Sequence, residues 1–156
     1  MYFGLSEEQE SIQDFVKKFL ADNATVDEIR KIANGEGEEL EKNIFDGILN
    51  LGINTLLIPE EHNGLGAGLL HAVAVAQALG AGVGPVPFVG SYVMAPIAIN
   101  LGGSEEQKNN YLPKIASNEL RFGIGMSEFV GAREDAGIEF STVSYTHLRA
   151  HETSLH

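Results

Sequence analysis

The sequence predicts an all-α domain, a six-helix bundle with orthogonal and up-and-down packing, followed by the first strand or strands of a β domain. Apolar residues recur at helical spacing up to residue 116. No Asp, Glu, Lys or Arg lies between Glu61 and Glu105. Charged residues are rarely buried unless paired, so this charge-free stretch belongs to an interior. From Leu120 the apolar residues alternate instead, which is the period of a strand and ends the helical pattern.

Capping residues and apolar stripes predict the first three helices. Ser6 and Gln9 form a capping box that starts a helix ending at Asn23. A second, short helix begins at Thr25, and a third stops at Gly52, because glycine readily takes the left-handed conformation after a helix. The side chains expected to face inward are Leu5, Ile12, Phe15, Val16, Phe19, Leu20, Val26, Ile29, Ile32, Ala33, Leu40, Ile44, Ile48 and Leu51.

Two buried helices are predicted within the charge-free stretch, after a short extended run at residues 53–58. Residues 69–79 are apolar on almost all sides, which is typical of a buried helix. Residues 89–101 form a second such helix. Pro96 either kinks this helix or marks its first turns. Both segments are shorter than the roughly 20 apolar residues of a membrane span, so no span is expected.

A sixth, polar helix starts at a second capping box, Ser104 with Gln107, and runs to about Ala116. Its expected inward side chains are Tyr111, Leu112 and Ile115. The change of period that follows places a domain boundary near Asn118. Residues 1–118 are then the helical domain, and residues 119–141 are the beginning of a truncated β domain.

Composition limits the possible partners. The chain of 156 residues has 22 acidic and 10 basic side chains, a net charge of −12. Nucleic acid is excluded as a partner, because phosphate binding needs clustered Lys and Arg. The absence of cysteine excludes disulfides and thiolate metal sites. With no signal-type leader after Met1, we expect a cytoplasmic protein.

Residues 142–156 are interpreted as a non-native tail. Residues 142–153 read TVSYTHLRAHET, show no apolar periodicity, and back-translate codon by codon to a transposase-type sequencing adapter. Adapter read-through would remove His147, His151 and His156 from any argument about a site. It also implies that the authentic chain continues past Ser141 into a longer protein. The alternative is a disordered polar terminus.

No residue of this chain is assigned to catalysis or to a metal. Glu60 and Glu61 are adjacent, so they do not face each other, and they favour a helix N-terminus rather than an acid–base pair. His62 and His71 lack metal-ligand spacing. We expect His62 in a loop and His71 early in a helix, bonded to a backbone carbonyl.

Several short motifs occur in a fixed order along the chain. They are Phe3-x-Leu5-Ser6-Glu7-Glu8-Gln9, Gly52-Ile53, Pro59-Glu60-Glu61-x-x-Gly64-x-Gly66, Ala78-Leu79-Gly80, Pro85-Val86-Pro87-Phe88, Gly103-Ser104-Glu105-Glu106-Gln107-Lys108 and Tyr111-Leu112-Pro113. Each is weak alone, but the ordered set resembles the N-terminal α-helical domain of the acyl-CoA dehydrogenase family. The resemblance covers Met1 to about Glu128.

The resemblance implies an FAD-dependent α,β-dehydrogenation of acyl-CoA thioesters. In that family a glutamate removes the α-proton while the β-hydride passes to the flavin. The usual oxidant is electron-transferring flavoprotein, and the enzyme is a homotetramer or a heteromeric dehydrogenase. The catalytic glutamate belongs to the family's C-terminal helical domain, so this fragment alone is expected to be inactive.

Five residues take implied roles from the resemblance. Phe88 and Tyr92 match the acyl-pocket helix and are the implied substrate-lining residues. Ile124, Met126 and Ser127 match the strand that contacts the flavin. The alternative for the two aromatic residues is an ordinary place in the core.

The chain departs from the family pattern just beyond these residues. Phe129 replaces a proline, and residues 131–134 read GARE where the family has Gly-Ser-Asp. The altered loop leaves a non-catalytic, dehydrogenase-like subunit of a heteromeric complex as an alternative. A freestanding helical binding module is a third possibility, and it requires the tail to be genuine. The preference for acyl chain length, branching or a sterol side chain stays open.

Overall fold

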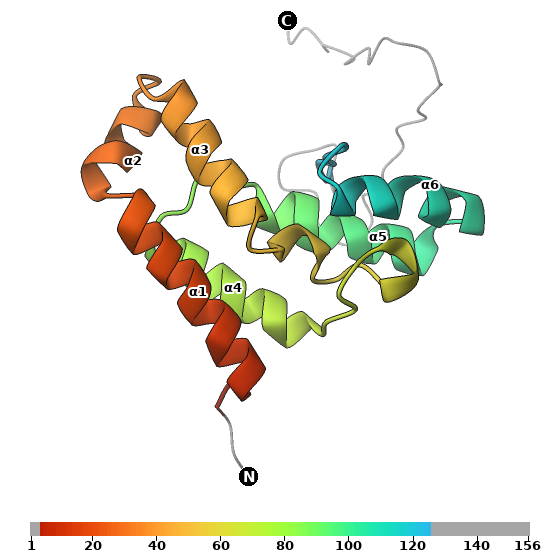
Figure 1. The fold of residues 1–156 in the computed structure, drawn as a ribbon. Coiled ribbons are helices and arrows are strands. Elements are labelled where there is room, and N and C mark those ends of the chain that lie inside the picture. The colour runs from red at the N-terminus through yellow and green to blue at the C-terminus, as the bar shows by residue number, and fades with distance from the viewer. Residues whose placement is uncertain (1–3, 126–156) are drawn as a thin grey trace, which may run out of the picture. The chain divides into compact units, whose positions relative to one another are not determined.

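The computed structural model describes residues 4–125, of which residues 4–124 belong to one structural unit. It is all-α, as predicted, with six α-helices and no strand in this part of the chain (Figure 1). The elements are α1 (Glu7–Asn23), α2 (Val26–Ala33), α3 (Glu38–Leu49), η1 (Ile53–Thr55), η2 (Glu60–His62), α4 (Leu69–Ala81), η3 (Phe88–Met94), α5 (Ala95–Gly102) and α6 (Glu105–Ala116). The predicted boundary near Asn118 stays a prediction, and the predicted tail lies outside the described residues.

Helices α1 and α4 lie side by side and form the most extensive helix pair of this unit (Figure 1). The predicted capping box of α1 is present: the Gln9 backbone N–H donates to Ser6 Oγ at 3.3 Å, and the Ser6 N–H donates to Gln9 Oε1 at 3.0 Å. Gln13 Nε2 ties the two helices together by donating to the Ala74 carbonyl at 3.3 Å. The apolar residues of both helices join one core, which includes Val16, Leu20, Ala72, Val75, Ala78 and Leu79.

Three side chains expected inward in α1 and α2 are exposed instead. Phe15 is 61% exposed, Val26 is 66% exposed, and Ala33 is also exposed. Helix α2 has only eight residues and contains no fully buried side chain, although Ile29 and Ile32 pack against the core. A periodic stripe shows which side of a helix is apolar, but neighbouring elements decide how much of that stripe is covered.

The segment after α3 is not extended. Gly52 ends the helical region in the left-handed conformation, with φ of 79°, as predicted. Residues Ile53–Thr55 then form a 3₁₀ turn, in which the Thr55 hydroxyl donates to the Gly52 carbonyl at 2.8 Å. The prediction of an extended run was therefore wrong, because a side chain that satisfies a nearby carbonyl stabilises a turn over a strand.

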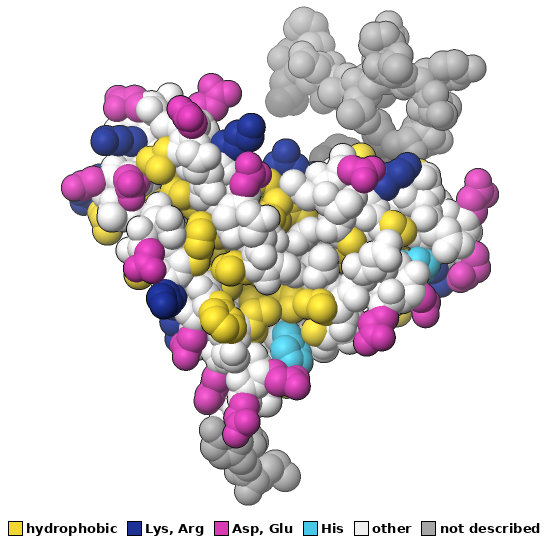
Figure 2. All heavy atoms as spheres, in the orientation of Figure 1, with side chains coloured by type: hydrophobic (Ala, Val, Ile, Leu, Met, Phe, Trp, Pro, Cys, Tyr) yellow, Lys and Arg dark blue, Asp and Glu magenta, His cyan; other side chains and the backbone are white. Residues whose placement is uncertain are grey.

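Helix α4 is buried on one side only. Its inner side includes Val75 and Leu79, which are 0% and 5% exposed. Its other side presents Leu69, Leu70 and Val73, which are 56%, 63% and 42% exposed. Figure 2 shows hydrophobic side chains reaching the surface over α1, α3 and α4, with acidic side chains around them. The prediction of a helix buried all round holds for one face and is wrong for the other.

The last helices follow their capping signals. Pro96 lies in the first turn of α5, which confirms one of its two predicted placements. The capping box of Ser104 and Gln107 starts α6, as predicted. Residues 120–125 contain no strand, so that prediction was wrong for these residues, and its remainder lies outside the described part of the chain. A strand needs a neighbouring ladder to satisfy its backbone groups, and the Leu120 N–H instead donates to the Lys114 carbonyl at 3.1 Å.

Candidate functional site

The charge-free stretch contains a π-helical segment, η3, which leads directly into α5. The Ala95 N–H donates to the carbonyl of Gly90, five residues earlier, which is the hydrogen-bond spacing of a π-helix. Pro96 follows and has no N–H, so the backbone pattern must change at this point. Segments of π-helix are rare and frequently occur at functional sites, which makes η3 the first candidate element.

The structure brings the two predicted substrate-lining residues together in η3, inside the core. Phe88 is 4% exposed and Tyr92 is 0% exposed. The Tyr92 hydroxyl donates to Asn118 Oδ1 at 2.8 Å. Burial raises the pKa of Tyr92 above its ordinary value, and the nearby positive charge of Arg121 partly opposes that increase. Contact of these two side chains with a substrate stays a prediction.

Polar side chains attach the segment after α6 to the rest of the unit. The Ser91 hydroxyl, which is on η3, donates to the Phe122 carbonyl at 2.8 Å. Asn54 Nδ2, on η1, donates to the Ala116 carbonyl at 2.6 Å. Asn118 has a φ of 57°, a left-handed conformation that asparagine tolerates better than most residues. These hydrogen bonds satisfy two partly buried carbonyls, those of Ala116 and Phe122, and they fix the path of residues 116–122.

Ring contacts support the same segment. Tyr111 and Phe122 meet edge to face, with ring centroids 5.4 Å apart and planes at 76°. The Arg121 guanidinium lies 4.8 Å from the centroid of the Phe45 ring, within the range of a cation–π contact. Residues 116–122 are therefore held by contacts with α3, η1, η3 and α6 before the chain reaches the predicted flavin-contact residues.

Of those three residues, the structure describes one. Ile124 is 37% exposed, beyond the fixed segment. Met126 and Ser127 lie outside the described residues, as do the altered positions 129–134. The flavin contacts of all three residues stay predictions.

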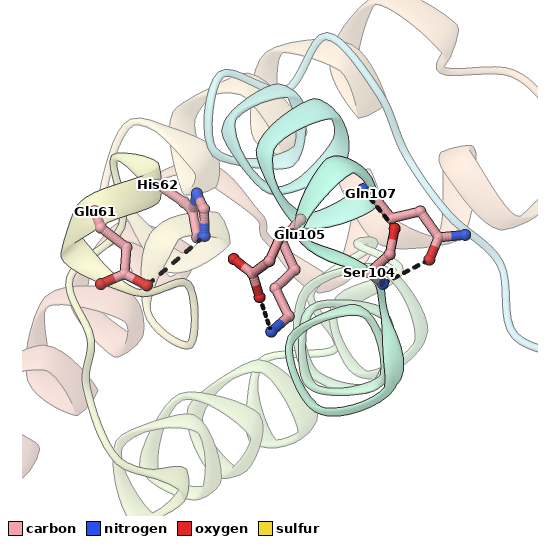
Figure 3. Close-up of polar contacts among 6 residues, drawn as sticks. Glu61, His62, Ser104, Glu105 and Gln107 are labelled. Atoms are coloured by element: carbon pink, nitrogen blue, oxygen red, sulfur yellow. Dashed lines mark hydrogen bonds and ion pairs between the residues drawn. The ribbon is translucent and has the colours of Figure 1, made fainter.

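The loop before α4 meets the N-terminus of α6 and forms a polar cluster (Figure 3). His62 is 5% exposed and lies in η2 rather than in a loop, with Nε2 3.8 Å from Glu61 Oε1. Glu105 is paired with Lys108 at 2.8 Å, and this hydrogen bond is the main reason that the pKa of Glu105 is lowered. Glu61 and Glu105 are exposed first-turn residues, which favour helix N-termini. The capping box of Ser104 and Gln107 and the acidic first turn stabilise the start of α6.

The other histidine of this region has an unusual environment. His71 is the third residue of α4, in agreement with the prediction of an early helical position. Its Nδ1 is buried without a hydrogen-bond partner in the described part of the chain, and its Nε2 lies 3.7 Å from Glu8 Oε2. The predicted bond to a backbone carbonyl was wrong. His71 instead faces a carboxylate across the α1–α4 pair.

Residues 4–125 offer neither a metal site nor a membrane-spanning helix. No group of three or more His, Cys, Asp or Glu side chains is placed to hold a metal ion there. None of the helices in the same range is long and apolar enough to cross a membrane. Sequence reasoning also missed Asn54, Ser91 and Asn118, because no short motif distinguishes a polar residue that will meet a distant carbonyl.

The comparisons with known proteins agree with the helical arrangement. The chain is 27% identical over 158 residues to acyl-CoA dehydrogenase FadE26 of Mycobacterium tuberculosis, which covers 96% of this chain and 37% of that protein. It is 32% identical over 129 residues to mitochondrial isovaleryl-CoA dehydrogenase of Pongo abelii, which covers 80% and 30%. A chain of the ChsE4-ChsE5 complex from Mycobacterium tuberculosis superposes with a TM-score of 0.71 at 26% identity, covering 85% and 36%.

The chain spans about a third of the length of these relatives. Residues 6–119 match the family described as acyl-CoA dehydrogenase, N-terminal domain. The matched residues include all six α-helices, η3 and the hydrogen bond from Tyr92 to Asn118. On this basis the chain belongs to the acyl-CoA dehydrogenase family.

Proposed function

We propose that this chain is the N-terminal part of an FAD-dependent acyl-CoA dehydrogenase, an enzyme that forms a double bond between the α and β carbons of an acyl-CoA thioester. In this proposal the helical unit supplies an apolar wall of the acyl and flavin pocket. Catalysis requires the rest of the protein, because no described residue is placed as a base. The electron acceptor is electron-transferring flavoprotein, and the intact enzyme is a homotetramer or a heteromer.

The observation that carries the proposal is the two-sided apolar character of the charge-free stretch. The stretch builds α4, η3 and α5 and lies between Glu61 and Glu105. Its inner side chains fill the core of the unit. Its exposed large apolar side chains are Leu65, Leu69, Leu70, Val73, Val83, Val89 and Leu101. A surface of this kind suits contact with an acyl chain or with another apolar domain, and it excludes water from a reaction.

Phe88 and Tyr92 are the proposed substrate-side residues. Because both are buried, their role is to set the shape and stiffness of η3, whose Val89 is 55% exposed on the outside. FAD, when bound, would accept the hydride from the β carbon. Ile124 is an exposed apolar side chain that fits against a flat flavin ring, and the proposed contacts of Met126 and Ser127 follow it in the chain.

The test uses the protein encoded when the reading frame is followed past Ser141 in its source genome, from a library prepared with different adapters. We expect a flavin-containing protein whose flavin absorbance bleaches on addition of an acyl-CoA and recovers with a dye acceptor. Straight-chain, branched and steroid side-chain thioesters are tested separately, because chain-length preference is open. A flavin-containing protein that bleaches with none of them would contradict the proposal.

A second candidate is a dehydrogenase-like subunit that acts only with a different partner chain. Two observations favour it: residues 129–134 depart from the family pattern, and a chain of the ChsE4-ChsE5 complex is among the similar structures. In this case the extended protein would purify without flavin when made alone. It would acquire flavin on co-expression with a second dehydrogenase gene from the same neighbourhood, whereas the homomeric enzyme would need no partner.

A further inference from the structure

The C-terminal end of α1, the start of α2 and the end of α4 come together (Figure 1). A groove that η3 does not line lies among these three helix ends. We call it the α1–α2–α4 groove. Its volume is about 370 Å³, a size typical of sites for small ligands. Its lining combines the cations Lys17 and Arg30 with apolar side chains that include Leu20, Val26 and Val83. Apart from the two cations the lining consists of apolar residues and one glycine.

The charge of the groove is opposite to that of the chain as a whole. The chain has 22 acidic against 10 basic residues, yet the groove lining contains Lys17 and Arg30 and no carboxylate. Two other hollows of the described unit differ: one is lined by Glu7 and Glu8, and the other by Asp46. Cations beside apolar walls are complementary to a ligand that has an apolar body and a negative head group.

Both cations have a partner on their own helix, but these pairs leave them available. Lys17 lies 3.6 Å from Asp14 and donates to Gln13 Oε1 at 2.6 Å, and Arg30 lies 3.1 Å from Asp27. All four charged side chains are about half exposed or more, and exposed ion pairs of this kind contribute little to the stability of the fold. Neither aspartate lines the groove. A ligand carboxylate could therefore replace the aspartates as the partner of both cations, because breaking these exposed ion pairs costs little free energy.

The rim of the groove exposes two large apolar side chains. Val83 has a φ of 51° and its residue is 63% exposed. A β-branched residue in the left-handed region is an outlier, because its side chain crowds the backbone there. The left-handed residue closes α4: the Gly84 N–H donates to the Leu79 carbonyl at 2.8 Å and the Val83 N–H donates to the Gly80 carbonyl at 3.3 Å, which is the Schellman geometry of a helix C-terminus. Val26, also of the groove lining, is 66% exposed, so two large apolar side chains are open to solvent at one groove.

We propose that the α1–α2–α4 groove binds a free carboxylate-bearing amphiphile, such as a fatty acid. Its aliphatic body packs against Leu20, Val26 and Val83. Its carboxylate is held by Lys17 and Arg30. Of the exposed large apolar side chains of the charge-free stretch, the groove is lined only by Val83, so it would act as a second ligand site of the protein.

The experiment follows methyl and amide NMR signals of the full 156-residue chain during titration with decanoate, with decan-1-ol as the neutral probe. We expect saturable shifts at Leu20, Val26 and Val83, and an affinity at least tenfold higher for decanoate. Lys17→Ala and Arg30→Ala should each weaken decanoate binding about tenfold, since each removes one charge-assisted contact. Lys42→Ala, on α3 and outside the groove, is the matched control for a lost positive charge.

Val83→Gly removes an apolar side chain from the groove without changing its charge. Glycine takes the left-handed conformation freely, so the variant should melt at a higher temperature while it binds decanoate more weakly. Equal affinity for decanoate and decan-1-ol would overturn the proposal, and so would an equal effect of Lys17→Ala and Lys42→Ala. Shifts at Val83 that depend on protein concentration without ligand would assign the groove to a second copy of the chain instead.

Discussion

Helices α4 and α6 have nearly the same length, 13 and 12 residues, but opposite relations to solvent. Helix α6 begins at a side-chain cap, buries Leu112 and Ile115, and is otherwise largely polar. Helix α4 has no side-chain cap and buries apolar residues on one side, yet its other side is also apolar and exposed. In α6, sequence polarity identifies the buried face. In α4 it identifies a helix with two apolar faces, only one of which this unit covers.

Packing within the helical unit therefore accounts for the apolar residues on the inner face of α4, but not for those on its outer face. Exposed apolar residues that occur singly are normal on a protein surface, but Leu69, Leu70 and Val73 are grouped on one helix. Within residues 4–125, none of the three belongs to the core or to the partly buried apolar side chains packed against it. The proposed function gives that face a role as a wall toward the remainder of a larger protein.

The sharpest test of the comparison is a pair of leucine truncations in α4. Leu79 is 5% exposed and belongs to the core, whereas Leu70 is 63% exposed. Leu79→Ala should lower the free energy of unfolding by about 2–5 kcal/mol, because it removes buried methyl groups and leaves a cavity. Leu70→Ala should change it by less than about 0.5 kcal/mol. Urea denaturation of the 156-residue chain measures both.

The same pair of variants compares the 156-residue chain with the extended protein. In the extended protein, Leu70→Ala should become destabilising if the outer face of α4 is covered there. An effect of Leu70→Ala as large as that of Leu79→Ala in the 156-residue chain would contradict the description of α4 as buried on one side.

The side-chain cap of α6 is tested at Ser104, the N-cap residue. Ser104→Ala removes the acceptor for the Gln107 N–H, now 3.2 Å away, and breaks the capping box of α6. We expect a loss of about 1 kcal/mol in unfolding free energy. Ser11→Ala, at an exposed position inside α1, is the control and should be neutral or slightly stabilising, because alanine is the better helix former. An equal loss for both variants would show that the cap contributes nothing.

The hydrogen bond of Tyr92 is tested by a substitution that keeps the ring. Tyr92→Phe should lower the unfolding free energy by about 0.5–1.5 kcal/mol near neutral pH, because Asn118 Oδ1 loses its donor. Burial raises the pKa of the folded-state hydroxyl above its ordinary value of 10.0. The unfolded chain therefore loses this proton first, and the stability from Tyr92 falls as pH rises above that value.

The measurement is urea denaturation of both proteins across a pH series. The difference in unfolding free energy between the native chain and Tyr92→Phe should be constant below about pH 10 and should become smaller above it. A gap that widens at alkaline pH would mean that the buried environment favours the ionised form.

The sequence predicted those elements of the fold that depend on local chemistry. The capping boxes at Ser6 and Ser104, the stop at Gly52 and the place of Pro96 all follow from groups within a few residues of one another, and all are confirmed. Local patterns do not reveal which neighbours cover an element. For that reason Phe15, Val26 and the outer face of α4 were expected to be buried.

The same limit applies to the candidate site. The resemblance brought Phe88 and Tyr92 into one element, and the structure places both there. Their link to the segment after α6 depends on Ser91 and Asn118, which lie 31 and 26 residues from their partners. No local spacing encodes such contacts. The π-helical backbone of η3 was also missed, because a charge-free apolar run with a proline fits an ordinary helix equally well.

The smallest expected effect comes from two glycines at the end of α4. A methyl group on Gly80 would meet no atom within 4 Å, whereas one on Gly82 would meet Leu20 Cδ1 at 2.6 Å. Gly80→Ala should stabilise the 156-residue chain by about 0.5–1 kcal/mol, because alanine has the higher helix propensity. Gly82→Ala should destabilise it, since Leu20 must move. If the extended protein covers this side of α4, the gain from Gly80→Ala should shrink there or reverse, and an unchanged gain would mean that this surface stays open.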